Sequence, residues 1–464
     1  MRPLEFFLVA LTAGAAIGLL IGHWKRIVSA LAAVALLALP VHAIIEGMHW
    51  QMVPAYVAIG VVCLARWMQH KHQRRATIIT ACSALLFVAL GVTFSILMPI
   101  FHLPTPTGRY PVGTSILYFK DSARSEDAVS GKGSARELMV QIWYPAQPSH
   151  NRLARYRLLK ETSLLSSYLS VVRTNSRQDA PLATENAPFQ VILFNHGWNG
   201  MRTSDTFLTE ELASHGYIVV SIDHTYNARQ VAFPDGRVIQ ADAPNDVNAP
   251  ETSTPDRVKA IWNKEMAKWV ADQRFVLDRL QQMNLTAGSP WFGRINAKST
   301  GSIGFSFGGA ASTAVCAEDE RVRAAVNMDG WFFGAIRQRG RNQPLLYIES
   351  YTGEESQSNQ TNSTVVSILG STDLADLKTS MHSFGGNWLS INGIVHEDLT
   401  DQPLISPLRI LSHRGTLPAK RIHNIVRSYV LAFFDRTLRG EDPAILHPNI
   451  RPYDEAIFEE WPQR

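Results

Sequence analysis

Cysteine is scarce in this chain of 464 residues, and its spacing excludes several kinds of protein. There are three cysteines, Cys63, Cys82 and Cys316. The first two lie in apolar runs and the third stands alone, so they cannot form a disulfide framework, and no Cys/His cluster of metal-binding spacing accompanies them. We therefore expect no disulfide-stapled fold, no metal site and no cofactor.

Clustered positive charge is also missing. The net charge of +4 is small for this length, and the lysines and arginines of the C-terminal part are scattered. This distribution argues against a nucleic acid as partner. Internal repeats and low-complexity tracts are absent from the sequence as well. What is abundant is apolar residues, at 46%, in a chain long enough for a membrane part and one large soluble domain.

Four long apolar runs fill the first hundred residues, at about 6–22, 27–45, 52–68 and 76–100. Each approaches the length of about 20 residues that a helix needs to cross a hydrocarbon core. A single run could be a buried helix or a signal peptide, but neither explains four in succession. The sequence predicts a multi-pass integral membrane protein with four transmembrane helices.

The short breaks between these runs predict the orientation. The break at 46–51 contains Glu46 and no lysine or arginine, whereas the breaks after the first and third runs are basic. Basic breaks belong in the cytoplasm. The residues after the fourth run are then expected to face the periplasm or exterior, most simply from a bacterial inner membrane. The basic residues are Lys25, Arg26, Arg66, Lys71, Arg74 and Arg75.

A proline-rich stretch, FHLPTPTGRYPV at 101–112, ends the membrane part. We place the boundary between a transmembrane domain, 1–104, and a soluble domain, 105–464. Apolar strands and amphipathic helices alternate in the soluble domain, which predicts an α/β fold with a mostly parallel sheet. Expected strands are 138–144, 190–195, 217–223, 300–305, 322–328 and 344–349; expected helices are 204–215, 255–283, 308–318 and 419–438.

The motif Gly-x-Ser-x-Gly occurs in GSIGFSFGGA at 301–310, centred on Ser306. An apolar strand precedes it and small residues follow, which is the setting of a nucleophilic serine on a strand-to-helix turn. The glycines are needed because side chains on either side of the serine would collide. The amide of Phe307 would then stabilise an oxyanion. A second amide, that of Trp198, is expected from the loop FNHGWNG at 194–200.

A nucleophilic serine needs a base and an acid, in the chain order serine, acid, histidine for this fold. His396 follows an apolar segment, which places it on a loop after a strand, and it is the preferred base. His382 and His413 are weaker candidates, and His423 falls within the last expected helix. Two acids follow apolar strands, Asp329 and Glu349, and spacing does not decide between them. Further candidates are Asp373 and Asp376.

Several stretches in the same order make residues 105–440 resemble the plasma-type platelet-activating factor acetylhydrolases and their bacterial relatives. The stretches are GRYPVGTSILYF, RELMVQIWYPA, LFNHGWNGMRTS, GFSFGG, NMDGWFFG and INGIVHEDLTD. The resemblance implies an α/β-hydrolase fold, metal-independent ester hydrolysis, and Ser306, Asp329 and His396 as nucleophile, acid and base. Phe305 departs from the family, which commonly has histidine there, and the plasma enzymes lack the four spans.

We therefore expect a membrane-anchored serine esterase that hydrolyses short or oxidised acyl chains of phospholipids. Phe305, Trp331 and Phe332 are expected to line the acyl site, and the leucine-rich segment 152–172 is a candidate lid or lipid-facing surface. Two alternatives remain: a polyester, lactone or small soluble ester hydrolase of the same fold, and a non-catalytic membrane protein whose hydrolase-like domain binds a ligand.

Overall fold

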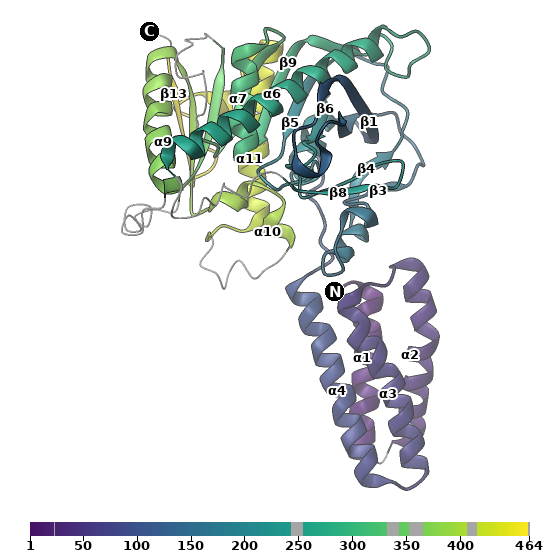
Figure 1. Ribbon diagram of the computed structural model, residues 1–464. Helices are drawn as coiled ribbons and strands as arrows, with labels where there is room; N and C mark the ends of the chain where they lie inside the picture. Colours follow the sequence, from purple (N-terminus) through teal and green to yellow (C-terminus); the bar gives the residue numbers. More distant parts are fainter. Residues whose placement is uncertain (23, 243–253, 332–342, 352–364, 406–414, 463–464) are drawn as a thin grey trace. The chain divides into compact units, whose positions relative to one another are not determined.

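The computed structural model describes residues 1–22, 24–242, 254–331, 343–351, 365–405 and 415–462. The chain forms two compact units (Figure 1). We call the first the helical unit; it comprises Met1–His102, Arg155–Arg173 and Leu404–Ser412. The second, the sheet unit, comprises Leu103–Ala154, Thr174–Pro403 and His413–Arg464. Residues 155–173 thus belong to the helical unit although they follow the first strands in the chain. The domain boundary at residue 104 stays a prediction.

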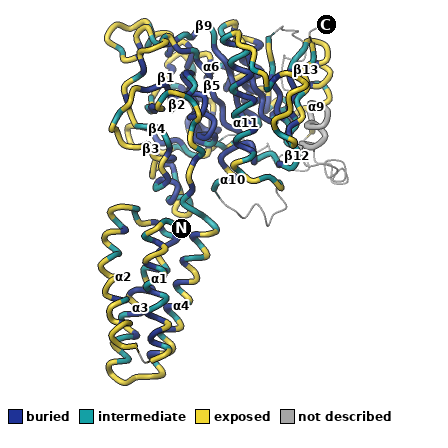
Figure 2. The backbone as a smooth tube through the Cα atoms, turned by 180° about the vertical axis from the view of Figure 1, so that it is seen from behind, coloured by how far each residue is buried: buried dark blue, intermediate teal, exposed yellow. Residues whose placement is uncertain are grey.

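Four long helices form the helical unit in its described part, and each is long and apolar enough to cross a membrane. They pack through small side chains such as Ala15, Ala65 and Ala84, which allow close approach of helix backbones. The exposed residues of these helices, at which the backbone tube is yellow in Figure 2, include large apolar ones. The helices are α1 (Pro3–Ile21), α2 (Lys25–Ile45), α3 (Val53–His70) and α4 (Arg74–Leu97).

Segment 155–173 contains two short 3₁₀ turns, η3 (Leu159–Glu161) and η4 (Ser167–Ser170), and packs on the helices of its unit. The indole nitrogen of Trp50 donates to Leu165 O over 2.9 Å. The rings of Phe101 and Tyr156 meet edge to face at 5.2 Å. The leucine-rich segment is thus a separate element laid on the ends of the helices.

An eleven-stranded sheet forms the core of the second unit as far as the structure describes it, in the order β13-β12-β11-β10-β9-β5-β6-β2-β1-β4-β3. Its central strands are parallel, from β6 through β12. The predicted α/β fold with a mostly parallel sheet is confirmed. The strands are β1 (Val112–Ser125), β2 (Ala135–Pro145), β3 (Leu153–Arg155), β4 (Arg173–Gln178), β5 (Phe189–Asn195), β6 (Ile218–Asp223), β9 (Ile295–Phe305), β10 (Val322–Met328), β11 (Leu345–Tyr351), β12 (Gly386–Asn392) and β13 (Ala456–Trp461).

Helices cover both faces of this sheet, and the strands between them are buried (Figures 1 and 2). Val191 and Leu193 of β5 share a core with α6 (Pro255–Leu285) and α7 (Phe307–Glu318). The opposite face carries α5 (Thr206–Ser214) and α11 (Ala419–Phe434), whose Phe434 ring lies against Gly301. Two further elements are α9 (Val365–Phe384) and the hairpin of β7 (Gln230–Ala232) and β8 (Val238–Gln240).

The parallel strands end at one edge of the sheet, and this fact positions the predicted site. Residue 306 follows β9, residue 329 follows β10, and residue 396 follows β12 by a short loop. The glycine loop at 196–200 follows β5, the neighbour of β9. Carboxyl ends of parallel strands are the usual place for a ligand site in such sheets.

Candidate active site

Ser306 lies between the last residue of β9 and the first residue of α7. Its φ of 55° and ψ of −124° are rare for a residue other than glycine. The Ser306 amide donates to Met328 O of β10 over 2.8 Å, and Gly309 N donates to Ser306 O over 2.9 Å. This strained strand-to-helix turn is the arrangement in which α/β hydrolases expose a nucleophilic hydroxyl.

The glycines around Ser306 make the turn possible, as the sequence predicts. A Cβ atom on Gly304 would lie 2.3 Å from the carbonyl carbon of Gly308. A Cβ atom on Gly308 would lie 2.2 Å from Asn195 O of β5. Both separations are much shorter than van der Waals contact, so β9, α7 and the end of β5 meet at backbone distance.

Asp329 and His396 are brought together by the ends of β10 and β12. His396 Nδ1 lies 2.7 Å from Asp329 Oδ2. Asp329 has a φ of 57° and also accepts hydrogen bonds from Ser350, from N over 3.2 Å and from Oγ over 2.5 Å. Burial opposes protonation of His396, but the hydrogen bond and charge of Asp329 outweigh it and raise the pKa of the imidazole.

Phe305 connects His396 to the serine turn. Its ring lies 4.5 Å from the imidazole between centroids, and Phe305 is the residue immediately before Ser306. His396 itself begins a short 3₁₀ turn, η8 (His396–Leu399). The residue that departs from the family pattern is thus in direct contact with the predicted base.

The other acids and bases considered from the sequence lie elsewhere. Glu349 accepts hydrogen bonds from Trp388 Nε1 over 3.0 Å and Ser390 Oγ over 2.8 Å, away from an imidazole. His382 stacks on Trp461, and His423 in α11 stacks on Phe207. Asp373 and Asp376 belong to α9, and His413 lies outside the described residues.

The loop after β5 touches the serine turn. A Cβ atom on Gly197 would lie 2.7 Å from the Phe305 ring and 3.3 Å from Ser306 Cβ. The Trp198 ring meets Phe307 edge to face at 5.1 Å between centroids. The two residues expected to supply oxyanion amides are therefore neighbours.

The other residues predicted for the acyl site are Trp331 and Phe332. Trp331 packs on Trp262 of α6, with 5.1 Å between ring centroids, and adjoins the main core of the sheet unit. Phe332 lies outside the described residues. Among the described residues of this set, Phe305 contacts His396 and Trp331 contacts Trp262.

A buried polar network, which sequence reasoning missed, supports the loop after β5. Asn195 Nδ2 donates to Gln273 Oε1 and Ser312 Oγ, each over 2.9 Å. Its Oδ1 lies 3.1 Å from His224 Nε2, and His224 N donates to His196 Nε2 over 3.3 Å. The end of β5, where the glycine loop begins, is therefore held by the side chains of His224, just after β6, Gln273 of α6 and Ser312 of α7.

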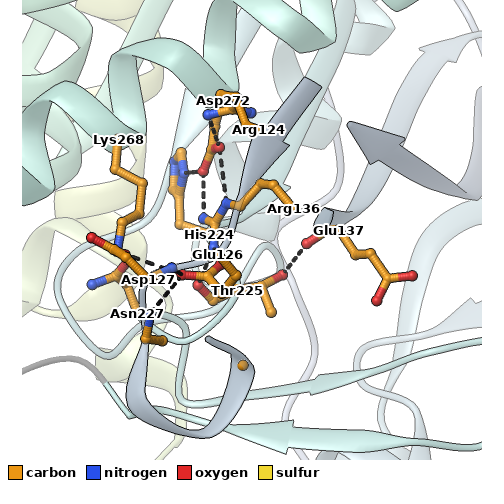
Figure 3. A network of polar contacts seen from close by, with 12 residues as sticks. Arg124, Glu126, Asp127, Arg136, Glu137, His224, Thr225, Asn227, Lys268 and Asp272 are labelled. Atoms are coloured by element: carbon orange, nitrogen blue, oxygen red, sulfur yellow. Dashed lines mark hydrogen bonds and ion pairs between the residues drawn. The ribbon is translucent and has the colours of Figure 1, made fainter. Parts of the chain in front are cut away.

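The network ends on Asp272 of α6, on which His224 and Arg136 converge (Figure 3). His224 Nδ1 and Arg136 Nη2 lie 2.9 Å and 2.6 Å from Asp272 Oδ2. Burial lowers the pKa of His224 to about 3. Burial would raise the pKa of Asp272, but the Arg136 guanidinium outweighs it and holds that pKa far below its usual range.

The described residues contain no group of three or more histidine, cysteine, aspartate or glutamate side chains that could hold a metal ion. At this edge of the sheet lie the serine turn and the hydrogen-bonded pair of His396 and Asp329. Such a set is suited to acyl transfer from an ester.

Comparison with known proteins agrees with this chemistry. The sequence model of the family described as "Platelet-activating factor acetylhydrolase, isoform II" matches residues 97–444. A probable 1-alkyl-2-acetylglycerophosphocholine esterase of Arthroderma benhamiae is 26% identical over 77% of this chain and 94% of its own length. The platelet-activating factor acetylhydrolase of Canis lupus familiaris is 25% identical, over 54% of this chain and 60% of its own.

A solved structure extends the likeness to the fold. The ferulic acid esterase of Streptomyces cinnamoneus superposes with a TM-score of 0.61 and 30% identity, over 77% of this chain and 99% of that one. The family match spans most of the chain and includes the serine turn, Asp329 and His396. The chain therefore belongs to the platelet-activating factor acetylhydrolase, isoform II, family, and it is a carboxylic ester hydrolase with an α/β-hydrolase fold.

Proposed function

We propose that the protein is a membrane-anchored serine esterase that hydrolyses short or oxidised acyl chains of phospholipids through Ser306, His396 and Asp329. The observation that carries this proposal is the 2.7 Å hydrogen bond between His396 Nδ1 and Asp329 Oδ2 beside the serine turn. The family match supports the substrate class, and so does the similarity to a probable 1-alkyl-2-acetylglycerophosphocholine esterase.

The proposed mechanism follows from these three side chains. Asp329 fixes the imidazole with its proton on Nδ1, which leaves Nε2 to take the proton of Ser306 as Oγ attacks the ester carbonyl. The amides of Trp198 and Phe307 stabilise the oxyanion. The imidazolium then protonates the leaving alcohol, and a water molecule, deprotonated by the same histidine, releases the acyl group and restores Ser306.

Membrane anchoring is proposed for the four helices. Their length and composition support it, as do the large apolar side chains on their outward faces. The basic residues lie at the helix ends that flank the α1–α2 and α3–α4 connections: Lys25 and Arg26 begin α2, Lys71 follows α3, and Arg74 and Arg75 begin α4. Glu46 lies in the connection between α2 and α3. This asymmetry supports a cytoplasmic side for the basic connections and an exterior or periplasmic site.

Segment 155–173 presents an apolar surface that is proposed to rest on lipid. The side chains of Leu164 and Leu165 are 79% and 62% exposed, and Leu159 is 63% exposed. Three large exposed apolar residues on one short segment are unusual for a surface in water. This location supports a role in presenting the esterase to the membrane surface.

A second candidate function is hydrolysis of a small soluble ester, with the helices only retaining the enzyme at the membrane. The likeness to a ferulic acid esterase, which covers nearly all of that protein, favours it. Family membership, in contrast, weighs against a non-catalytic binding protein.

The test compares two ester classes with the full chain reconstituted in vesicles. Phospholipids carrying a short or oxidised acyl chain should be cleaved, and Ser306→Ala should abolish the cleavage. A soluble nitrophenyl ester, measured on the same preparation, serves as the reference. Turnover of the soluble ester without cleavage of any phospholipid would replace the lipid substrate with the second candidate. Full activity of Ser306→Ala on both would remove the proposed nucleophile.

A further inference from the structure

A cavity of about 850 Å³ opens in the helical unit where segment 155–173 covers the helix ends. Its size is in the range of known ligand sites, about 300–1,000 Å³. The lining comes from the start of α1, the end of α2, the α2–α3 connection and both ends of segment 155–173. The polar and charged members that bear on the argument are Arg2, Glu46, His49, Tyr56, Arg155 and Arg173.

Positive charge prevails in this cavity. Three guanidinium groups line it, those of Arg2, Arg155 and Arg173, against one carboxylate, that of Glu46. The guanidinium of Arg2 already donates to Glu5 and to the backbone oxygens of Glu46 and Gly47, so it adds charge to the cavity but few hydrogen bonds. Arg155 Nη1 donates to the backbone oxygen of Ser170 over 2.6 Å, which holds the guanidinium in place with other N–H groups to offer. Fixed guanidinium groups of this kind match the geometry and charge of a phosphate.

The acidic groups near the cavity are already occupied. Glu46 accepts from Leu4 N over 2.9 Å and lies 3.0 Å from His42 Nδ1. Glu5, buried beneath, meets Arg2 Nε at 2.5 Å and His49 Nε2 at 2.8 Å. These contacts direct the carboxylates of Glu5 and Glu46 to partners within the helical unit, so they compete little with a bound anion for the guanidinium group of Arg155.

The other part of the cavity wall is apolar and continues onto the outside of α2. Ile44 and Ile45 line the cavity and are 84% and 70% exposed. Leu37 and Val41, farther along α2, are exposed too. A free phosphate ion would use the guanidinium groups alone, whereas a phospholipid would use both surfaces.

We propose that this cavity binds the phosphate-bearing headgroup of an anionic glycerophospholipid, whose acyl chains lie along the exposed face of α2. The proposal rests on the membrane insertion proposed above and assigns a lipid site separate from the one that holds Ser306. The bound lipid would fasten segment 155–173 to the bilayer surface through Arg155 and Arg173.

The test is native mass spectrometry of the full chain, released from nanodiscs that contain phosphatidylglycerol and phosphatidylcholine in equal amounts. The wild type should retain phosphatidylglycerol in preference. Loss of two charge-assisted contacts in R155Q/R173Q should lower its retention at least about tenfold. The matched control is Arg66→Gln, at the opposite end of α3, which should retain lipid as the wild type does.

Three results would overturn the proposal. They are equal retention of the two lipids by the wild type, unchanged retention in R155Q/R173Q, and displacement of the lipid by millimolar inorganic phosphate, which would indicate a free-anion site. If the double variant does not fold, R155Q and R155K are compared, and only R155K should keep the lipid. Soluble ester turnover of each sample, with Ser306→Ala beside it, separates this outcome from failure of the proposed esterase.

Discussion

His396 Nδ1 and Asp329 Oδ2 lie 2.7 Å apart, although 67 positions separate the two residues in the chain. The contact exists because β10 and β12 are both parallel to β11, which lies between them, so that their carboxyl ends meet at one edge of the sheet. Ser350, from the end of β11, completes the arrangement by donating to the same carboxylate. The proposed esterase activity depends on these three residues and on the glycine loop at 196–200.

Asp329→Asn should lower kcat on a soluble ester by about 10³- to 10⁴-fold, because an amide would hold the imidazole in the wrong tautomer. The folded state should persist, since asparagine has nearly the same shape. Glu349→Gln is the matched control, because Glu349 bonds Trp388 and Ser390 instead of an imidazole. Collapse of turnover in the control with a normal rate in Asp329→Asn would exchange the roles of the two acids.

The pH dependence of kcat/KM should report the ionisation of His396. Only the neutral imidazole can accept the serine proton, so activity should rise with pH through the pKa of His396. Asp329 raises that pKa, which puts the midpoint above the ordinary value of about 6.5. Folding favours the protonated form, so this ion pair adds stability that is lost as the pH rises through the same midpoint. A midpoint well below 6.5 would contradict the assignment of the base.

Ser350→Ala should reduce turnover severalfold and move the same pH profile upward. The hydroxyl donates to Asp329 over 2.5 Å, and without it the carboxylate charge acts more strongly on His396. A merely structural defect would lower activity without moving the midpoint. Ser390→Ala, which removes the hydroxyl that bonds Glu349, is the control and should leave the profile in place.

Gly197→Ala should impair catalysis in a folded protein. The added methyl group would lie 2.7 Å from the Phe305 ring and 3.3 Å from Ser306 Cβ, so the loop must move away from the serine turn. A shift of the Trp198 amide should lower kcat about 10²-fold or more if that amide holds the oxyanion. Gly60→Ala, where a Cβ meets nothing within 4 Å, is the matched control. Unchanged kcat would remove Trp198 from the proposed oxyanion hole.

Arg136→Met should destabilise the sheet unit by about 3–5 kcal/mol, because the buried carboxylates of Glu126 and Asp272 both lose this guanidinium, and the guanidinium that still meets Asp272 is that of the partly exposed Arg124. Arg237→Met, at a half-exposed ion pair with Glu137, should cost less than about 1 kcal/mol. Denaturant unfolding of the two variants under one set of conditions compares them. Equal midpoints would mean that Arg136 contributes no more than a surface charge.

Local patterns in the sequence predicted much of the fold and part of the site. The serine turn, β5, β9, β10 and α6 were all readable, because each is an apolar or amphipathic run with a recognisable beginning or end. Thr254, for instance, precedes a proline and caps α6, with its side chain accepting from Arg257 N. The fold class was confirmed for the same reason: strand and helix alternate in order along the chain.

The sequence alone could not predict contacts between residues that lie far apart in the chain. Asp329 and Glu349 end neighbouring strands and look alike locally, and only their surroundings distinguish them. The support of the β5 loop by His224 and Asp272 joins residues 48 positions apart, with no motif to mark them. Trp331 stands in a motif beside the acid, but its contact with Trp262 joins residues 69 positions apart and no local pattern marks it.

The helical unit is discontinuous in the chain, since residues 155–173 belong to it although β1 and β2 precede them. A ribosome therefore finishes the four helices long before it delivers the segment that caps them, and the first strands emerge in between. Biogenesis of this protein cannot proceed as two independent steps. An expression fragment that starts at residue 105 would carry the buried apolar side chains of this segment, among them Tyr168, Leu169 and Val172, without the four helices, and it should aggregate unless detergent takes the place of the helices.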